Sequence, residues 1–466
     1  MKAYDLAVVG AGPGGYVAAL RAARHGARVC LVERDRLGGT CLHRGCIPTK
    51  ALHATAQRLA MLKDCAQHGI RVGEVAFDPN QAMARKDAVV QRLEQGIAGL
   101  VRQGGVDLLH GDAMLEAPGR LRVRRPGWSA LVRADAVVLA TGSRAVRPGF
   151  LDAGGKNVLT SDEILVMQDL PSSLLVVGGG YIGCELAGIL ACFGVEVTLV
   201  EQRDHLLESQ DRDAVRTVAE GLRRLGVEII TGARIRQVED RAGIRAFLDD
   251  GRRLQADQLL AALGRSPNSA GLGLAEAGVS LDGAAVQVDE HMQTSVPGVY
   301  AIGDLTGSTM LAHVAMHHAE VAVARILGMQ GPDLGADAQV PSVVFTQPEL
   351  ARVGVTEADC RARGQSVAIG RFAYRANGKA LCDGAGDGLV KLVADASNGR
   401  LIGAVIVGAG ASTIVAEVAA AIKAGMTARQ LGTVVHAHPT LSEMVQEAAR
   451  DLDREAIHKP YKKDAG

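Results

Sequence analysis

The sequence lacks net charge, because its 51 lysines and arginines are balanced by 51 aspartates and glutamates. A chain without a basic or acidic excess has no general attraction for polyanions or for anionic membrane surfaces. Nucleic acid and membranes are therefore not expected as partners.

A secretory signal is also missing from the sequence as it stands. The first residues, MKAYDLAVVGAGPGG, contain no apolar block that ends in a small-residue cleavage site. The most apolar stretch, residues 174–200, contains the run GGG together with Glu185 and Glu196, which favours a strand, a turn, a helix and a second strand over a membrane span. Export is not expected, and the expected location is cytoplasmic.

Cysteine is scarce, and of the eight cysteines only Cys41 and Cys46 are close enough in sequence to suggest a local pair. In an intracellular chain, one close pair indicates redox chemistry rather than a disulfide scaffold. No metal site is expected. The length of 466 residues is too great for one ordinary core and favours about three domains.

One sequence unit occurs twice. Each copy has an apolar strand (YDLAVVG or SSLLVVG), a glycine-rich turn, a helical stretch, and a second apolar strand that ends in an acid. The corresponding residues of the two copies are 168 positions apart: Gly10, Gly12, Gly15 and Glu33 in the first, and Gly178, Gly180, Gly183 and Glu201 in the second.

The physical demands of a dinucleotide explain these glycines. The first permits a tight turn, the second lets the backbone approach a pyrophosphate, and the third lets the helix pack on the strand. The phosphates then lie at the helix N-terminus. One such motif is weak evidence, because glycine turns also occur for packing alone, but two copies with acids at the same spacing predict two dinucleotide-binding units.

The remaining sequence predicts further elements of an α/β chain. Residues 134–143 and 257–268 are typical of buried strands, and Asp304 lies at the end of another, just before a helix expected to begin near Met310. From about residue 340 the pattern favours an antiparallel sheet with helices on one side. The expected fold is α/β, with two Rossmann-like dinucleotide-binding domains and a C-terminal α+β domain.

The segment GGTCLHRGCIPTK places the cysteine pair directly after the first nucleotide unit. In a regular helix, Cα atoms five residues apart are separated by roughly 8.6 Å, whereas a disulfide needs about 4.4 to 6.8 Å. A bonded pair therefore requires a distorted turn. Gly45 offers the conformational freedom, and Pro48 lacks the N–H that would bond the carbonyl of Arg44. A cysteine at a helix N-terminus has a stabilised thiolate. Two buried structural thiols are the alternative.

The C-terminal run HAHPTLSE contains a possible acid–base pair. Pro439 restricts His438 to an extended conformation and is expected to open a helix at its first position, with Glu443 near the end of the first turn. A carboxylate placed there would orient the imidazole, which can accept a thiol proton. Taken alone, a histidine before a proline is more often a loop residue.

The sequence resembles the pyridine nucleotide-disulfide oxidoreductase family almost from end to end. The motifs GAGPGGY, GGTCLxxGCIPxK, ATGS, GGGYIGCE, LGRSPN, AIGD, MLAH and HPTLSE occur in the family's order. The resemblance implies an FAD domain (1–147), an NAD domain (148–270), a central domain that completes the FAD site (271–339), and an interface domain that forms a homodimer (340–466).

The resemblance also implies the roles of individual residues. Cys41 corresponds to the thiol that meets the substrate and Cys46 to the thiol that contacts the flavin. His438 and Glu443 correspond to an acid–base dyad that reaches the cysteines of the other subunit, so a monomer would be inactive. Expected FAD-binding residues are Gly10, Gly12, Gly14, Gly15, Glu33, Gly39, Thr40, Lys50, Thr141, Gly142, Asp304, Met310, Leu311, Ala312 and His313. Expected NAD-binding residues are Gly178, Gly180, Tyr181, Ile182, Gly183, Glu185, Glu201 and Gly264.

The motifs are most similar to the branch of the family that oxidises dihydrolipoamide, borne by a protein of a 2-oxo acid dehydrogenase complex or a glycine cleavage system, with NAD+ as acceptor. Glu201 favours NAD over NADP because a carboxylate repels a 2′-phosphate, although Arg203 and His205 soften that preference. No lipoyl-bearing extension precedes the first motif, so the lipoyl group is expected on a partner.

Three alternatives remain open. A glutathione reductase usually has basic residues where Glu201 stands, and a mercuric reductase has a second cysteine pair near its C-terminus, where this sequence reads KKDAG. A mainly structural flavoprotein subunit of a dehydrogenase complex is the third. His43 and Arg44 replace the Asn and Val that are more usual between the cysteines, and this leaves substrate choice and redox potential open.

Overall fold

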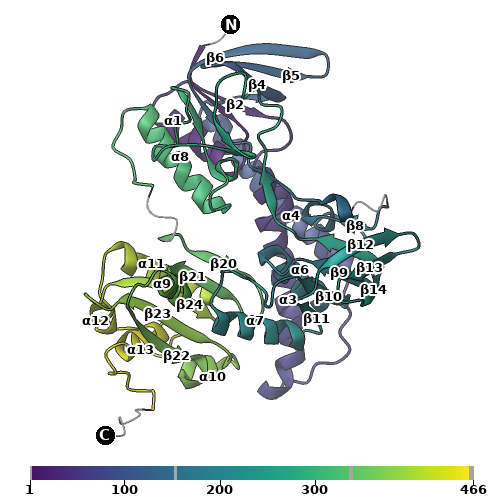
Figure 1. Cartoon of the computed structure of the whole chain (residues 1–466), viewed down its shortest axis with the longest axis vertical. Coiled ribbons are helices and arrows are strands. Elements are labelled where there is room, and N and C mark those ends of the chain that lie inside the picture. The colour runs from purple at the N-terminus through teal and green to yellow at the C-terminus, as the bar shows by residue number, and fades with distance from the viewer. Residues whose placement is uncertain (1–2, 152–154, 335–338, 461–466) are drawn as a thin grey trace.

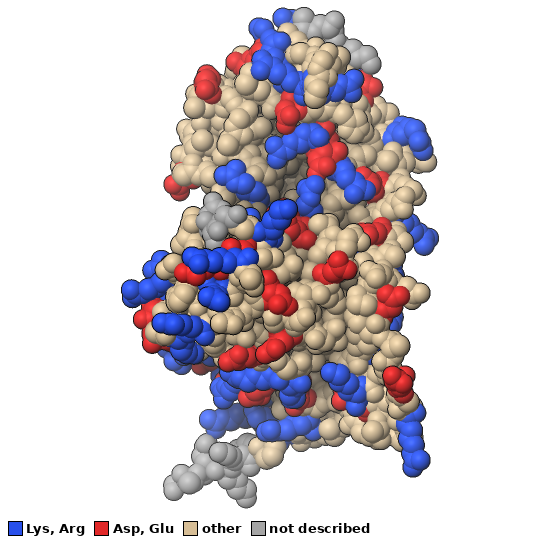
Figure 2. Space-filling view, turned by 90° about the vertical axis from the view of Figure 1, so that its right-hand side faces the viewer, with Lys and Arg blue, Asp and Glu red and all other residues tan. Residues whose placement is uncertain are grey.

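The computed structural model describes residues 3–151, 155–334 and 339–460, and the KKDAG segment lies outside these residues. The helices and strands form three groups that are distinct in space (Figure 1). On the face shown in Figure 2, positive and negative side chains are interspersed, in keeping with the balanced composition. Within the described residues, no helix is long and apolar enough to cross a membrane.

The first group is built on a seven-stranded sheet in the order β3-β2-β1-β6-β5-β4, with β19 also paired to β6. Strands β1, β2, β3 and β19 join β6 in a parallel arrangement, whereas β4, β5 and β6 form an antiparallel meander. The strands are β1 (Ala3–Val9), β2 (Val29–Glu33), β3 (Asp107–His110), β4 (Asp112–Ala117), β5 (Arg120–Arg125), β6 (Trp128–Leu139) and β19 (Val299–Ala301).

Helices cover this sheet because its central strands are apolar on both faces; Leu6, Ala7 and Val8 of β1 are fully buried. The first glycine turn joins β1 to α1. The helices of this group are α1 (Pro13–Arg24), α2 (Gly39–Arg44), α3 (Cys46–Asp64), α4 (Pro79–Gln103) and α8 (Ala312–Ile326).

The second group contains a parallel five-stranded sheet in the order β11-β10-β9-β15-β8. Residues 174–200 form a strand, a helix and a strand, as predicted. The strands are β8 (Val158–Leu159), β9 (Ser173–Val177), β10 (Glu196–Glu201), β11 (Glu228–Thr231) and β15 (Gln258–Ala261). The helices are α5 (Ser161–Ile164), α6 (Tyr181–Cys192) and α7 (Arg212–Arg224).

Short antiparallel pairings complete these two groups. Strand β7 (Ser143–Ala145) pairs with β16 (Arg265–Pro267) and lies where the chain passes between the two large sheets. The remaining strands are β12 (Ile235–Asp240), β13 (Ile244–Leu248), β14 (Arg253–Ala256), β17 (Leu281–Asp282) and β18 (Ala285–Val286). The prediction of one strand over residues 257–268 is therefore wrong, because this segment divides between β15 and β16, which belong to different sheets.

The third group is an antiparallel sheet in the order β20-β21-β24-β23-β22, as the sequence predicts. Its strands are β20 (Ser342–Val344), β21 (Leu350–Gly354), β22 (Val367–Ala373), β23 (Leu389–Asp395) and β24 (Leu401–Val407). Its helices are α9 (Glu357–Ala362), α10 (Gly378–Cys382), α11 (Ala411–Lys423), α12 (Ala428–Gly432) and α13 (Glu443–Asp451).

Helix α3 connects the redox segment to the second sheet. Leu52 and Ala56 of α3 are buried in the same core cluster as Leu186, Ile189 and Leu190 of α6. The helix that begins at Cys46 thus packs against the helix that follows the second glycine turn. Residues of both glycine turns and the two cysteines line one cavity.

Candidate active site between two dinucleotide-binding turns

The two glycine turns have the same local geometry. Gly10 has φ +97° and Gly178 has φ +107°, a region that favours glycine. A Cβ atom on Gly15 would lie 1.8 Å from the carbonyl oxygen of Gly10, and one on Gly183 would lie 1.9 Å from that of Gly178. The third glycine of each turn is therefore required for packing of the helix against the strand.

The second glycine of each turn has space in front of it. A Cβ atom on Gly12 or Gly180 would meet nothing within 4 Å. These glycines are the N-caps of α1 and α6, and no side chain caps either helix. The first N–H groups of both helices are thus available to an anion, as a pyrophosphate requires.

The two acids also occupy equivalent places. Glu33 accepts hydrogen bonds from the backbone N–H of Ala11 (2.6 Å) and of Asp35 (2.8 Å). Glu201 accepts from Gly179 (2.7 Å) and from Arg203 (2.8 Å). Each carboxylate thus holds its glycine turn in place and keeps further lone pairs for a ribose hydroxyl.

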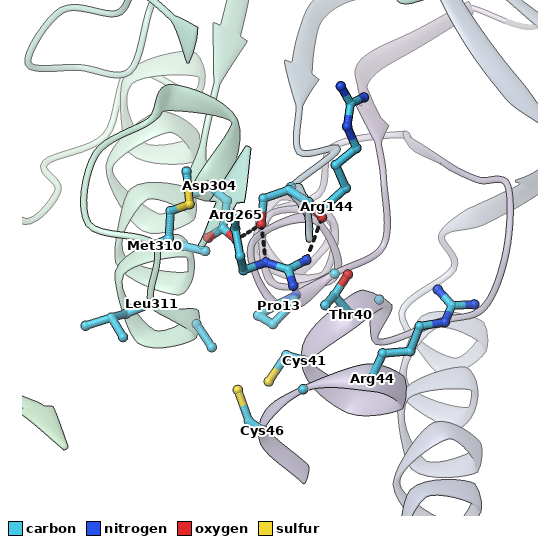
Figure 3. A pocket seen from close by; sticks show the side chains of 18 of the residues that line it. Pro13, Thr40, Cys41, Arg44, Cys46, Arg144, Arg265, Asp304, Met310 and Leu311 are labelled. Carbon is cyan, nitrogen blue, oxygen red and sulfur yellow. Dashed lines mark hydrogen bonds between the residues drawn. The ribbon is translucent and has the colours of Figure 1, made fainter. Parts of the chain in front are cut away.

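A cavity of about 1280 Å³ runs between the two turns and contains most of the predicted cofactor residues (Figure 3). A smaller cavity of about 450 Å³ lies on the other side of the second turn and includes Gly178 and Glu201. The predicted residues that line the larger cavity are Gly10, Gly12, Gly14, Glu33, Gly39, Thr40, Lys50, Thr141, Gly142, Gly180, Tyr181, Ile182, Glu185, Gly264, Asp304, Met310, Leu311 and Ala312.

Three predicted cofactor residues line neither cavity. Gly15 and Gly183 serve the packing described above. The Nε2 atom of His313 lies 2.8 Å from the carbonyl oxygen of Pro341, and this contact ties α8 to the segment before β20. A role of His313 in FAD binding stays a prediction.

The cysteine pair lies on the predicted distorted turn. Helix α2 ends at Arg44, Gly45 has φ −145° and ψ −114°, and α3 begins at Cys46. The carbonyl of Gly45 accepts from the N–H of Thr49 at 3.1 Å and from its hydroxyl at 2.6 Å. Figure 3 shows the sulfur atoms of Cys41 and Cys46 directed toward each other at the edge of the cavity.

The thiol of Cys46 is more acidic than an ordinary cysteine, and the thiol of Cys41 is less acidic. A hydrogen bond from Cys41 and the charge of Lys50 lower the pKa of Cys46 to about 7, although burial opposes ionisation. The hydrogen bond to Cys46 and burial raise the pKa of Cys41 far above its ordinary value. In the dithiol state, the thiolate therefore resides on Cys46, at the N-terminus of a long helix.

An ion pair connects the helix of Cys46 to α6. Nζ of Lys50 lies 2.7 Å from Oε2 of Glu185, which is buried on α6. The other carboxylate oxygen of Glu185 accepts from the N–H of Phe345 at 2.9 Å, and Nζ of Lys50 lies 4.4 Å from the centroid of the Phe345 ring. One lysine thus connects the redox helix, the second nucleotide helix and the third sheet.

The acid–base dyad has the predicted contact but a different local structure. Nδ1 of His438 lies 2.9 Å from Oε1 of Glu443, and Oε2 accepts from the N–H of Thr440 at 2.7 Å. Helix α13 begins at Glu443 itself, so the prediction that Pro439 opens the helix is wrong. Burial opposes ionisation of Glu443, yet the bonds from Thr440 and His438 hold the pKa of its carboxyl below the ordinary value.

The dyad does not reach the cysteines of its own chain. The side chain of His438 is 79% exposed, and neither His438 nor Glu443 lines the cavity that contains Cys41 and Cys46. The described residues of one chain therefore provide the redox pair at one place and the imidazole at another. That the two halves of the site come from different subunits stays a prediction.

His43 and Arg44, the unusual residues between the cysteines, do not act alike. His43 is buried, and its Nε2 atom lies 2.8 Å from the carbonyl oxygen of Leu37. Arg44 lines the cavity and pairs with Asp35, and Figure 3 shows its side chain directed away from the sulfur atoms. Both residues thus support the segment that carries the cysteines.

A polar network in the cavity was not predicted from the sequence. Arg265 donates from Nε to the hydroxyl and from Nη2 to the carbonyl of Ser143, both at 2.8 Å. The hydroxyl of Ser143 donates to Asp304 at 2.5 Å. The network fixes Asp304 next to the link between the two large sheets. Among the described residues, no group of three or more His, Cys, Asp or Glu side chains could hold a metal ion.

Comparison with known proteins agrees with this geometry. Residues 4–319 match the family model for pyridine nucleotide-disulphide oxidoreductases, and residues 340–449 match the dimerisation domain of the same family. Dihydrolipoyl dehydrogenases from Bacillus subtilis and Thermus scotoductus are 37% and 39% identical to this chain; each match covers 98% of this chain and 99% of the relative.

Solved structures agree as well. LpdA from Mycobacterium tuberculosis is 29% identical, with a TM-score of 0.90 over 97% of this chain and all of that one. The HOCl-induced flavoprotein disulfide reductase RclA from Escherichia coli, determined as a Cu(II) complex, is 28% identical with a TM-score of 0.87 over 96% of this chain and 99% of that one. The predicted fold class is confirmed, and the chain belongs to the pyridine nucleotide-disulphide oxidoreductase family.

Proposed function

We propose that this chain is an FAD-dependent enzyme that oxidises protein-bound dihydrolipoamide to lipoamide with NAD+ as acceptor. The observation that carries the proposal is the placement of the Cys41–Cys46 pair in a cavity between two dinucleotide turns. Curated relatives of nearly equal length, named dihydrolipoyl dehydrogenase, support the choice of substrate.

The cofactors are FAD and NAD, and the chain provides a suitable site for each. For FAD, the open N-terminus of α1 would receive the pyrophosphate, while Glu33 and Asp304 would contact its sugar hydroxyls. For NAD, the N-terminus of α6 and Glu201 would act in the same way. When bound, FAD accepts two electrons from the enzyme dithiol and supplies them as hydride to NAD+.

In the first half of the reaction, His438 acts as the base. Its Nδ1 atom is engaged by Glu443, which leaves Nε2 to accept a proton from one thiol of dihydrolipoamide. The resulting thiolate attacks the sulfur of Cys41, a mixed disulfide forms, and the Cys41–Cys46 bond breaks. Cys46 departs as a thiolate, which Lys50 and the N-terminus of α3 stabilise.

The second half completes the exchange. The other substrate thiol attacks the mixed disulfide, the ring of lipoamide closes, and the sulfur of Cys41 leaves. Cys41 takes a proton from the imidazolium of His438. Two electrons have then moved from the substrate to the cysteine pair, one proton is on Cys41, and the second substrate proton goes to solvent. The high pKa of the Cys41 thiol and the low pKa of Cys46 favour this distribution.

The proposal includes a homodimer, in which the dimerisation domain brings His438 of one subunit to the cysteines of the other. The proposed partner is a protein that bears a lipoyl group on a swinging arm, which would bring the dithiol to the Cys41–Cys46 pair in the cavity and to the exposed imidazole of His438. A cytoplasmic location fits a cysteine pair that alternates between disulfide and dithiol at each turnover and is not a permanent structural cross-link. Cell fractionation would test the location.

The decisive experiment is NAD+ reduction by the purified, FAD-loaded protein with dihydrolipoamide as donor. NADP+ as acceptor, and NADH oxidation with glutathione disulfide, serve as comparisons. Rapid turnover that prefers NAD+ and is lost in Cys41→Ser is the expected result. A flavin-loaded protein that reduces glutathione disulfide but leaves dihydrolipoamide unchanged would overturn the choice of substrate.

A further inference from the structure

The segment before α7 runs along both cavities. Glu208 lines the 450 Å³ cavity together with Glu201, whereas Ser209 and Gln210 line the 1280 Å³ cavity that contains the cysteines. Gly180 borders both cavities. If a dinucleotide binds with its adenosine at Glu201 and its phosphates at Gly180, its nicotinamide would enter the larger cavity, whose lining includes Gln210.

Gln210 is a buried polar residue with incomplete hydrogen bonding. The residue is 6% exposed, and Nε2 of its side chain donates to the hydroxyl of Tyr181, the first residue of α6. Within the described residues, the Oε1 atom of Gln210 is buried and has no hydrogen-bond partner. Such an acceptor is costly in a folded protein and calls for a functional explanation.

The backbone on either side of Gln210 is held by the third sheet. Arg352 of β21 donates from Nη1 to the carbonyl of Ser209 at 2.7 Å. The buried Lys391 of β23 donates to Asp211 at 2.7 Å and to Asp213 at 2.8 Å. Two cations from another part of the chain thus fix the position of this glutamine, and a fixed side chain binds a ligand with little loss of conformational entropy.

We propose that Gln210 binds the carboxamide group of the nicotinamide ring. In the free protein, the hydroxyl of Tyr181 binds the side-chain amide of Gln210 instead. The inference rests on the proposed function, because it takes the second turn to be the NAD site. A primary carboxamide presents N–H donors and a carbonyl acceptor, so it pairs with both ends of the Gln210 amide. The tyrosine hydroxyl satisfies only one end.

If the carboxamide replaces the hydroxyl of Tyr181 on Gln210, two substitutions should change the affinity for NAD+ in opposite directions. Gln210→Leu keeps the size of the side chain and removes both hydrogen-bonding groups. Two hydrogen bonds to the carboxamide are lost, but the bond to Tyr181 no longer has to be broken. The net loss is about one neutral hydrogen bond, so NAD+ should bind about 3- to 10-fold more weakly. Tyr181→Phe removes the competing hydroxyl, so NAD+ should bind more tightly. In the double variant, the effect of Tyr181→Phe should disappear.

Direct titration of the FAD-loaded protein tests this without turnover. Three ligands are compared with one another: NAD+, ADP-ribose and 3-acetylpyridine adenine dinucleotide. ADP-ribose lacks the nicotinamide, and the third ligand has a methyl ketone in place of the amide. Gln210→Leu should weaken NAD+ binding, leave ADP-ribose binding unchanged, and abolish the preference of the wild type for NAD+ over the ketone analogue. Gln210→Glu, which retains an acceptor, should restore part of that preference.

Gln202→Leu is the matched control. Gln202 lines the 450 Å³ cavity together with Glu201, so its loss should weaken the binding of NAD+ and of ADP-ribose equally. Equal effects of Gln210→Leu on NAD+ and ADP-ribose, or no effect on either, would overturn the role of Gln210 while the NAD site itself stands. A wild-type protein that binds neither ligand would overturn the NAD site, and this inference with it.

Discussion

Lys50 lies 2.7 Å from Glu185, and this ion pair joins the helix that begins at Cys46 to the helix that begins at Tyr181. Each partner acts on the cysteine pair, but with opposite sign. The ammonium of Lys50 lowers the pKa of Cys46, whereas the carboxylate of Glu185 raises it. The hydrogen bond from Cys41 lowers the pKa of Cys46 most, and the ion pair adds its own effect on that pKa while it joins the two helices.

Replacement of each partner should move the pKa of Cys46 in opposite directions. Lys50→Met should raise it from about 7 by about one pH unit or more, because a neighbouring positive charge is lost. Glu185→Gln should lower it. The measurement is the pH dependence of Cys46 alkylation by iodoacetamide in the dithiol enzyme, with the site identified by mass spectrometry.

The sign of the wild-type profile follows from the lowered pKa. The reactive thiolate is present above about pH 7, and the alkylation rate should fall about tenfold per pH unit below that value, because the thiol form does not react. Lys63→Met, an exposed lysine in the last turn of the same helix, is the control and should leave the profile unchanged. A shift in the same direction for both Lys50→Met and Glu185→Gln would contradict the electrostatic explanation.

Loss of His438 should reduce dihydrolipoamide oxidation by about 10²- to 10⁴-fold, the usual contribution of a general base. Glu443→Gln should cost less, because the imidazole remains and only its orientation and charge stabilisation are lost. Steady-state assays with dihydrolipoamide and NAD+ provide the measurement. His291→Gln, an exposed histidine in a loop, is the control. Wild-type turnover in His438→Gln would remove this residue from the mechanism.

Local sequence rules predicted those parts of the site whose geometry is local. The turns at Gly10 and Gly178 follow from the steric demand of a strand, a tight turn and a helix within six residues, and the structure shows the close contacts that exclude a side chain. The break at Gly45 follows equally from the reach of a disulfide. Such arguments require no knowledge of the rest of the chain.

Long-range contacts could not be predicted in this way. Arg265 bonds Ser143 across 122 positions, which requires the pairing of β7 with β16. Gln210 is one polar residue in an irregular segment, and only its burial beside Tyr181 in the folded chain indicates a role in binding. The preference of proline for the first turn of a helix predicts a start at Pro439, but α13 begins at Glu443, whose carboxylate accepts from the N–H of Thr440 ahead of the helix.

Substitutions of the two kinds of glycine should separate cofactor binding from folding. Gly12→Ala adds a methyl group where nothing lies within 4 Å, so the apoprotein should keep its stability but lose affinity for FAD. Gly15→Ala places the methyl group 1.8 Å from a backbone oxygen and should destabilise the apoprotein by about 1–3 kcal/mol. Thermal unfolding of the apoproteins and flavin fluorescence titrations would distinguish the two effects.

Hybrid dimers offer the sharpest test of a site shared between subunits. Cys46→Ser and His438→Gln each lack one half of the site, so either variant alone should be nearly inactive. If the subunits reassort at random from an equal mixture, half of the dimers are hybrids, and each hybrid contains one site with both an intact cysteine pair and an intact imidazole. Activity should then recover to about one quarter of the wild-type value. Because His438 is exposed and lies outside the cavity of its own cysteines, a mixture that stays inactive after subunit exchange would mean that each chain folds its own dyad onto its own redox pair.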